Sequence, residues 1–162
     1  MPLQIPVEFT LNGCIRHVTV PAAMSTLTML RETFDLTGTK LACGEGECGA
    51  CTILVDGVTV NACLMFAVDC DGRHVQTIEG VRIGEQLDPL QQAFVRHGAV
   101  QCGFCTPGMI MQARYLLAKN PTATREEIKR GLEGNLCRCS GYQKTIEAVA
   151  DVAHKATAKG AS

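Results

Sequence analysis

The chain has 162 residues, of which ten are cysteine, and its 15 Lys and Arg residues nearly balance 16 Asp and Glu residues to give a net charge of −1. Without a basic excess, this composition argues against a protein that binds nucleic acid or an anionic membrane surface. The hydrophobic fraction of 46% is enough for a packed core and argues against a disordered chain.

The N-terminal segment MPLQIPVEFTLNG carries neither the basic nor the apolar region of a secretory signal. No apolar run in the sequence approaches the roughly 18 residues that a membrane-spanning helix needs. These features predict a soluble, cytoplasmic protein. Because thiols stay reduced in that compartment, the ten cysteines indicate metal ligation rather than a disulfide framework.

The first half of the sequence predicts a small α+β sheet domain. Apolar residues alternate with other residues over 5–20, and Asn12 and Gly13 form a two-residue hairpin signal within that range. A helix is expected next, with Ser25 or Thr26 as its N-cap. Three further strands are predicted, at 52–55, 58–62 and 74–78.

Residues 79–88 break this pattern, and every later segment is typical of helix, so we predict two domains, residues 1–79 and residues 80–162. Start signals or an apolar stripe mark four helices in the second domain. These signals are Asp88 with Pro89, Thr106 with Pro107, the capping box of Thr124 and Glu127, and the stripe Ile146, Val149, Ala150 and Ala153. The second domain is therefore predicted to be a four-helix bundle.

The first group of cysteines has the ligand spacing of a plant-type ferredoxin. A C-x4-C-x2-C run followed by a distant cysteine is typical of a 2Fe-2S cluster. Gly44, Gly46 and Gly49 would let such a loop curl around the cluster and turn backbone N–H groups toward its sulfurs. Zinc matches less well, because structural zinc prefers two compact pairs of ligands and this pattern has one long gap. The four predicted ligands are Cys43, Cys48, Cys51 and Cys63.

Four more cysteines form two close pairs at predicted helix junctions. One pair precedes the helix that starts at Thr106, and the other precedes the last helix. Two loops at one end of a bundle could gather four thiolates around a diiron core. A C-x2-C pair is also common in zinc sites, so spacing alone leaves both metals open. These predicted ligands are Cys102, Cys105, Cys137 and Cys139.

Three segments that contain these cysteines, TGTKLACGEGECGACTILVDG, QCGFCTPGMIM and GNLCRCSGYQ, resemble the signature segments of the small iron–sulfur subunit of the molybdenum hydroxylases, the xanthine oxidase family. The similarity extends from about Val7 to Val152. It implies a ferredoxin-like β-grasp domain followed by the helical domain, with a 2Fe-2S cluster in each. Within this family, the segment NACLMFAVDCDGRHVQTIEG leans toward the carbon monoxide dehydrogenase type of small subunit.

The resemblance also implies electron transfer, with no catalytic residue in this chain. Single electrons would pass from a molybdopterin dinucleotide in a large subunit through the cluster of the helical domain. They would then pass through the first cluster to FAD in a medium subunit. Gln101 and Cys139 would lie against the pterin, and the whole would be a dimer of heterotrimers. The residues that discriminate the substrate would belong to the large subunit.

Two other functions are compatible with the cysteine pattern. A freestanding two-cluster ferredoxin would carry electrons between soluble partners, and a zinc-binding interaction module would bind no iron. A diffusible carrier needs an exposed second cluster, whereas a cluster buried beside another cofactor requires a partner subunit.

A few residues near the cysteine groups are assigned structural roles. Cys14 and Cys70 lie outside both groups and are predicted to be buried or half-buried apolar residues. Met109 and Met111 are predicted to pack in the core of a helix. Phe104, which lies between two cysteines, is predicted to shield its cluster from water.

Overall fold

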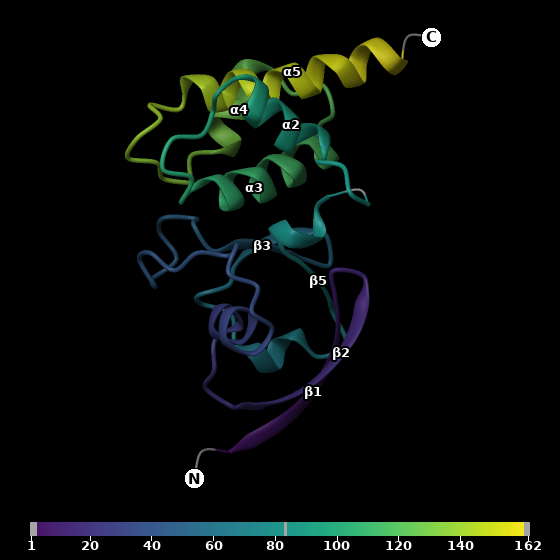
Figure 1. Cartoon of the computed structure of the whole chain (residues 1–162), viewed down its shortest axis with the longest axis vertical. Helices are drawn as coiled ribbons and strands as arrows, with labels where there is room; N and C mark the ends of the chain where they lie inside the picture. The colour runs from purple at the N-terminus through teal and green to yellow at the C-terminus, as the bar shows by residue number, and fades with distance from the viewer. Residues whose placement is uncertain (1–2, 83, 161–162) are drawn as a thin grey trace.

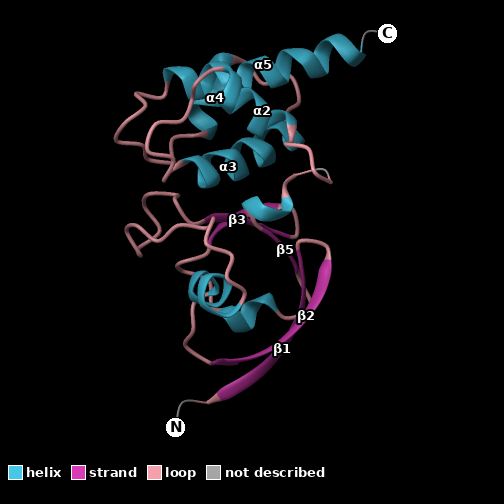
Figure 2. Cartoon of the chain, viewed as in Figure 1, coloured by secondary structure: helices cyan, strands magenta, loops and turns pink. Residues whose placement is uncertain are grey.

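The computed structural model describes residues 3–82 and 84–160 and has an α+β architecture (Figure 1). A sheet and short helical turns form the N-terminal half, and the longer helices form the C-terminal half, as the colours of Figure 2 show. The predicted α+β class is confirmed. Within the described ranges, no helix is long and apolar enough to cross a membrane.

The described residues of the N-terminal half form one five-stranded sheet with the order β2-β1-β5-β3-β4. β1 pairs with β2, and β3 with β4, as antiparallel hairpins. β5 lies between the hairpins, parallel to β1 and antiparallel to β3. The predicted strands are present, with the bounds Gln4–Leu11 (β1), Cys14–Pro21 (β2), Thr52–Val55 (β3), Val58–Asn61 (β4) and His74–Gln76 (β5).

Both hairpins turn on two residues with positive φ. Asn12 and Gly13 have φ angles of 51° and 83°, and Asp56 and Gly57 have φ angles of 50° and 77°. Two successive left-handed residues are the requirement of a type I′ turn, whose twist fits that of the paired strands. The tight turns set the register of each hairpin, and register decides which side chains face the core.

The predicted helix after β2 begins as expected but does not continue as a regular α-helix. Ser25 caps α1 (Thr26–Thr28) by accepting a hydrogen bond from a backbone N–H of that helix. The chain then forms a π-helical turn over Met29–Thr33. After this wider turn, the ring of Phe34 packs edge-on against Phe9 of β1, with 5.8 Å between the ring centroids.

The described part of the C-terminal half contains α2 (Pro89–Arg96), α3 (Thr106–Lys119), α4 (Arg125–Gly131) and α5 (Gln143–Gly160). Asp88 caps α2 and Thr124 caps α4, each through a reciprocal capping box. Met109 and Met111 are buried in the core of this half, which confirms their predicted packing role.

Strand β3 joins the two halves, because helix α3 packs across it. Leu54 of β3 belongs to the core of the helical half, whereas Ile53 and Val55 belong to the core under the sheet. All four residues of β3 are therefore buried. A strand covered on both faces reads as a continuous apolar run rather than as an alternation.

The two cysteines outside the predicted ligand groups differ in burial. Cys70 is fully buried, as predicted. The prediction for Cys14 is wrong, because its side chain is exposed. Cys14 begins β2, an edge strand whose first four residues are all exposed, so the core does not cover this end of the hairpin.

We expect the N-cap of α2 to contribute more to stability than the N-cap of α4. Asp88 accepts a hydrogen bond from the Leu90 N–H at 2.9 Å and also pairs with Arg114, whose side chain is 28% exposed. Asp88→Ala removes a cap worth about 1 kcal/mol and leaves the guanidinium unpaired, which costs about 1–3 kcal/mol more. Thr124→Ala, at the exposed cap of α4, should cost about 1 kcal/mol. Urea denaturation followed by circular dichroism measures both losses, and equal losses would contradict the expectation.

Candidate metal centres

The first group of cysteines lies at one end of the β3–β4 hairpin. Three of them occupy the loop that leads into β3, and the fourth, Cys63, lies two positions after Asn61, the last residue of β4. Thr52 and Asn61 face each other at this end of the hairpin, so pairing brings the distant fourth cysteine back to the loop. Pairing of β3 with β4 thus explains how a ligand that is distant in sequence can lie beside the other three. The four residues are Cys43, Cys48, Cys51 and Cys63.

Glycine shapes the loop that carries this group. Gly44, Gly46 and Gly49 have φ angles of 74°, 85° and 66°, which is the left-handed region that favours glycine. The Asn61 amide donates a hydrogen bond to the Gly46 carbonyl at 2.7 Å and so ties the loop to the end of β4. The predicted curl of the loop is confirmed.

The thiols of the first group have unlike environments but influence one another. The backbone N–H of Glu45, together with the N–H and thiol of Cys48, lowers the pKa of Cys43 to about 6. The Glu45 nitrogen lies 3.5 Å from the Cys43 sulfur. Burial raises the pKa of Cys51 to about 12, and the nearby thiols of Cys63 and Cys48 add to the rise. These mutual effects link all four cysteines into one group.

The second group of cysteines lies where two loops of the helical half meet. Cys102 and Cys105 precede α3, and Cys137 and Cys139 lie between α4 and α5. The sulfur of Cys139 lies 3.7 Å from that of Cys102. Cys105 and Cys137 form the other contact between the loops. The structure therefore brings together the two sequence-distant pairs, as the sequence predicted.

Burial and local hydrogen bonds again give two thiols of this group different pKa values. Burial raises the pKa of Cys105 to about 12, and the neighbouring Cys137 thiol raises it further. Burial also opposes ionisation of Cys137, but hydrogen bonds from the hydroxyl and N–H of Ser140, from the Cys105 thiol and from the Cys139 N–H together lower the pKa of that thiol to about 7. The Ser140 N–H donates to the Cys137 sulfur at 3.3 Å.

A cavity of about 480 Å³ opens beside the second group. Phe104 and Leu136 line it together with the four cysteines, and their side chains are 46% and 55% exposed. Phe104 therefore lies where shielding was predicted, but it leaves that side of the group open to solvent in the isolated chain. Tyr142, with a φ of 66°, accepts the Cys137 N–H on its hydroxyl at 2.8 Å.

Gln101 and Cys139, the predicted contacts of a partner's cofactor, lie next to each other. The Gln101 side-chain nitrogen donates to the Cys139 carbonyl at 3.0 Å, and both residues are exposed. The bond holds the Gln101 side chain at the rim of the second cysteine group.

The donor set of each group fits a diiron cluster. Four cysteine thiolates, two for each iron, would hold a 2Fe-2S cluster. The observed sulfur contacts come in twos, with Cys102 next to Cys139 and Cys105 next to Cys137.

Cysteine spacing did not identify every residue that shapes these sites. Asn135 and Tyr142 lie inside the segment GNLCRCSGYQ. Asn135 contacts Gly49, which is far away in the sequence, and Tyr142 contacts Cys137 within a local turn. The sequence indicated these residues only by their position near two cysteines. A buried asparagine and a tyrosine in a left-handed turn are identified only when the loops are seen together.

Two family models for iron–sulfur proteins match the chain. Residues 9–76 match a 2Fe-2S iron-sulfur cluster binding domain, and residues 77–150 match a 2Fe-2S binding domain. Together these ranges include both groups of cysteines.

Several characterised subunits and solved structures are similar to this chain over nearly its whole length. It is 49% identical to the nicotine 6-hydroxylase small subunit of Paenarthrobacter nicotinovorans, over 91% of this chain and 89% of the relative. It is 47% identical to the nicotinate dehydrogenase small FeS subunit of Eubacterium barkeri, over 90% and 93%. A chain of quinoline 2-oxidoreductase from Pseudomonas putida 86 superposes with a TM-score of 0.92 at 45% identity, over 96% and 97%.

Unequal thiol ionisation should be measurable in the folded, metal-free chain. With a pKa near 6, Cys43 is mostly thiolate at pH 7, whereas Cys51 and Cys105 stay protonated at that pH. Because the thiolate is the nucleophile, we expect iodoacetamide to modify Cys43 first and to slow as the pH falls through 6. Mass spectrometry of peptides from a pH series measures each site, with exposed Cys14 as the reference. Modification of Cys51 as fast as Cys43 would contradict the assignment.

Proposed function

Because the chain belongs to the family of small iron–sulfur subunits of the molybdenum hydroxylases, we propose that it connects a molybdopterin-binding large subunit to an FAD-binding medium subunit. When bound, its two 2Fe-2S clusters supply one-electron transfer between those partners. The observation that carries the proposal is the arrangement of eight thiols into two separate groups, each assembled from two loops.

We assign one cluster to each group of cysteines. The mutual contacts of the thiols support this division, since each buried thiol is influenced by cysteines of its own group. The first cluster would be held by Cys43, Cys48, Cys51 and Cys63, and the second by Cys102, Cys105, Cys137 and Cys139.

The chain's own residues would control protons and charge at these sites. Buried Cys51 and half-buried Cys105 have pKa values of about 12 and hold their protons at neutral pH, so both would have to lose a proton to serve as cluster ligands. The N–H groups of Glu45 and Ser140 point to sulfurs that carry negative charge in the holoprotein. Hydrogen bonds of this kind stabilise the more negative, reduced state and raise the reduction potential.

The second group is the better candidate for the side that faces the molybdopterin. Cys139 and Gln101 are both exposed and are joined by a hydrogen bond at the rim of the open cavity. An amide side chain offers a ring system both a donor and an acceptor. We therefore keep Gln101 and Cys139 as the proposed contacts with the pterin.

We describe the architecture as a β-grasp domain, residues 1–79, followed by a four-helix bundle, residues 80–162. The mixed sheet with a helix packed on one face supports the first assignment. The hydrophobic core shared by α2, α3, α4 and α5 supports the second. The family models change over between residues 76 and 77, three positions before the proposed boundary.

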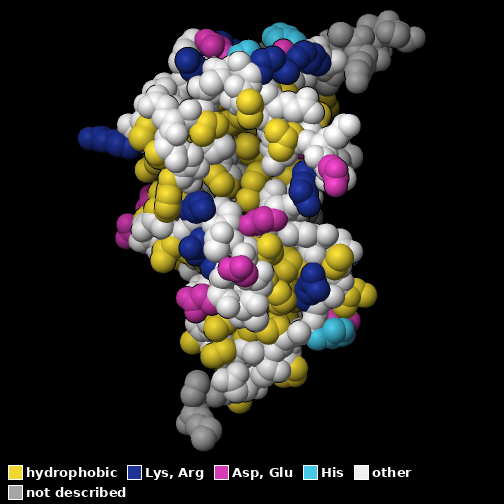
Figure 3. Space-filling model, in the orientation of Figure 1, with side chains coloured by type: hydrophobic (Ala, Val, Ile, Leu, Met, Phe, Trp, Pro, Cys, Tyr) yellow, Lys and Arg dark blue, Asp and Glu magenta, His cyan; other side chains and the backbone are white. Residues whose placement is uncertain are grey.

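Exposed apolar side chains near both cysteine groups suit a subunit better than a diffusible carrier. Figure 3 shows hydrophobic side chains on the surface of both halves. Leu64 and Phe66, after the last cysteine of the first group, are 58% and 51% exposed, and Phe104 and Leu136 line the second site. Partner subunits would cover such surfaces. We propose that the assembly is a dimer of heterotrimers and resides in the cytoplasm, where the ten free cysteines stay reduced.

Relatives suggest a class of substrate for the complex. The names nicotine 6-hydroxylase, nicotinate dehydrogenase, xanthine dehydrogenase and caffeine dehydrogenase all refer to nitrogen heterocycles. Other relatives are named aldehyde oxidoreductases. Because nitrogen heterocycles appear in the names of the more similar relatives, we propose that the large subunit partner of this chain hydroxylates an aromatic nitrogen heterocycle. The resemblance of one segment to the carbon monoxide dehydrogenase type of small subunit stays a prediction from sequence.

Removing one ligand should abolish one cluster and spare the other. We expect Cys43→Ser to lose the electron paramagnetic resonance signal of the first cluster and about half of the bound iron, because the groups are separate. Cys14→Ser, which changes an exposed cysteine outside both groups, is the matched control and should keep both signals. Loss of only the second cluster's signal in the Cys43 variant would show that the ligand grouping is wrong.

Purification of the chain from its native host should recover the partner subunits. We expect equal amounts of a molybdenum-containing and a flavin-containing chain in the same complex, because the apolar side chains beside both cysteine groups need partners. Mass measurement of the intact complex and its metal content tests this. Recovery of the chain alone, as a fully active carrier, would favour the freestanding ferredoxin instead.

A further inference from the structure

We propose that Asn135 is a positioning residue that fixes the separation of the two clusters. The inference rests on the proposed function, because it takes the two groups of cysteines as cluster ligands. Asn135 lies between α4 and α5, two residues before Cys137, and is 3% exposed. Its side chain reaches out of the helical half to the loop that carries the first group.

The side-chain amide of Asn135 bonds two groups of the N-terminal half. Its nitrogen donates to the Gly49 carbonyl at 2.9 Å and to the Thr52 hydroxyl at 3.2 Å. The Thr52 hydroxyl in turn donates to the same Gly49 carbonyl at 2.7 Å. The backbone N–H of Asn135 donates to the Leu132 carbonyl at 3.0 Å, which holds the residue to the end of α4. Because these bonds are buried, losing one leaves polar groups without water to replace it.

Leu136 extends this contact to the backbone. Its N–H donates to the Cys48 carbonyl at 2.9 Å. Cys48 belongs to the first group, and Cys137, the residue after Leu136, belongs to the second. A single hydrogen bond therefore connects the backbone of one proposed ligand to the residue that adjoins a ligand of the other cluster. Electron exchange depends steeply on separation, so this link influences how fast the clusters exchange electrons.

Glycine sets the nearest approach of the two loops. A Cβ atom on Gly49 would lie 2.3 Å from the Gly134 carbonyl oxygen, and a Cβ atom on Gly108 of α3 would lie 2.2 Å from the Gly49 carbonyl oxygen. The backbones are thus in contact and cannot come closer. The hydrogen bonds of the Asn135 amide prevent the opposite movement, because they keep the two loops from moving apart.

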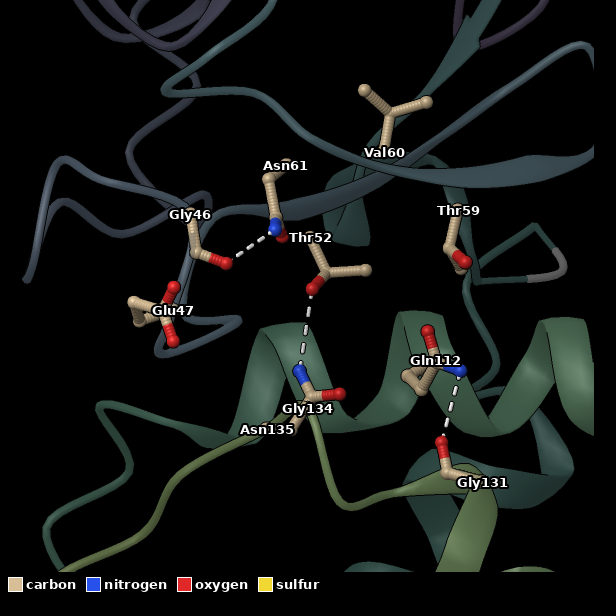
Figure 4. A pocket seen from close by; sticks show the side chains of 10 residues that line it. All are labelled: Gly46, Glu47, Thr52, Thr59, Val60, Asn61, Gln112, Gly131, Gly134 and Asn135. Atoms are coloured by element: carbon tan, nitrogen blue, oxygen red, sulfur yellow. Dashed lines mark hydrogen bonds between the residues drawn. The ribbon is translucent and has the colours of Figure 1, made fainter.

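Figure 4 shows how the Asn135 bond differs from others around an adjoining cavity of about 360 Å³. The bond from Asn135 to Thr52 crosses from one half of the chain to the other. The Gln112 amide makes a similar bond to the Gly131 carbonyl at 2.9 Å, but within the helical half.

The test compares Asn135→Asp with Gln112→Glu in the intact complex, purified anaerobically and fully reduced. Each change keeps the shape of the side chain and removes the amide donor. Electron paramagnetic resonance at low temperature reports both clusters and the magnetic splitting between them, which falls with the inverse cube of their distance. We expect Asn135→Asp to keep both signals and the iron content but to lose the single defined splitting. We expect Gln112→Glu, whose amide bond lies within the helical half, to keep the splitting of the unsubstituted chain.

A second variant covers the case in which Asn135→Asp does not assemble. Thr52→Val removes an acceptor of the Asn135 amide and should likewise weaken or spread the single defined splitting. An unchanged splitting in both variants would overturn the proposal, and so would an equal change in Gln112→Glu. Loss of a cluster from both variants would assign Asn135 to cluster assembly, which also overturns a role in spacing. Absence of two cluster signals from the unsubstituted chain would instead refute the proposed function.

Discussion

Backbone contact between Gly49 and the helical half is the constraint on which the rest of the structure depends. Gly49 follows Cys48 directly, and Gly108 lies one helical turn after Cys105, so each glycine adjoins a cysteine group. A side chain at either position would collide with a carbonyl oxygen. The first turn of α3 can therefore rest on the cysteine loop. Because α3 also packs across β3, the same contact aligns the sheet with the helices.

In both groups, a thiol with a raised pKa lies near a thiol with a lowered pKa. Each contains a thiol whose pKa is raised by burial, Cys51 or half-buried Cys105, and a thiol whose pKa is lowered by hydrogen bonds, Cys43 or Cys137. Four thiolates gathered in one place would repel one another without a metal. Iron supplies the compensating charge, so metal binding and the final packing of the loops are thermodynamically coupled.

Patterns local in sequence predicted much of this molecule. The capping residues Asp88 and Thr124 each depend on neighbours within a few positions, and the structure places them as expected. Features set by distant contacts were missed. The π-helical turn before Phe34 accompanies packing on another strand, and the exposure of Cys14 follows from the edge position of β2. Asn135 was missed for the same reason, since its partners lie more than 80 residues away.

The open side of the second group has a consequence for how such a protein is made in the cell. Cys102 and Cys139 are exposed, and the apolar rim of Phe104 and Leu136 faces solvent. On the proposed function, a partner subunit covers this opening, so iron and sulfide would have to enter before that partner docks. The same opening admits oxygen, to which exposed thiolates are sensitive. The proposal thus implies that cofactor insertion comes first and docking second, and that a chain without its partners is the stage most vulnerable to oxidative damage.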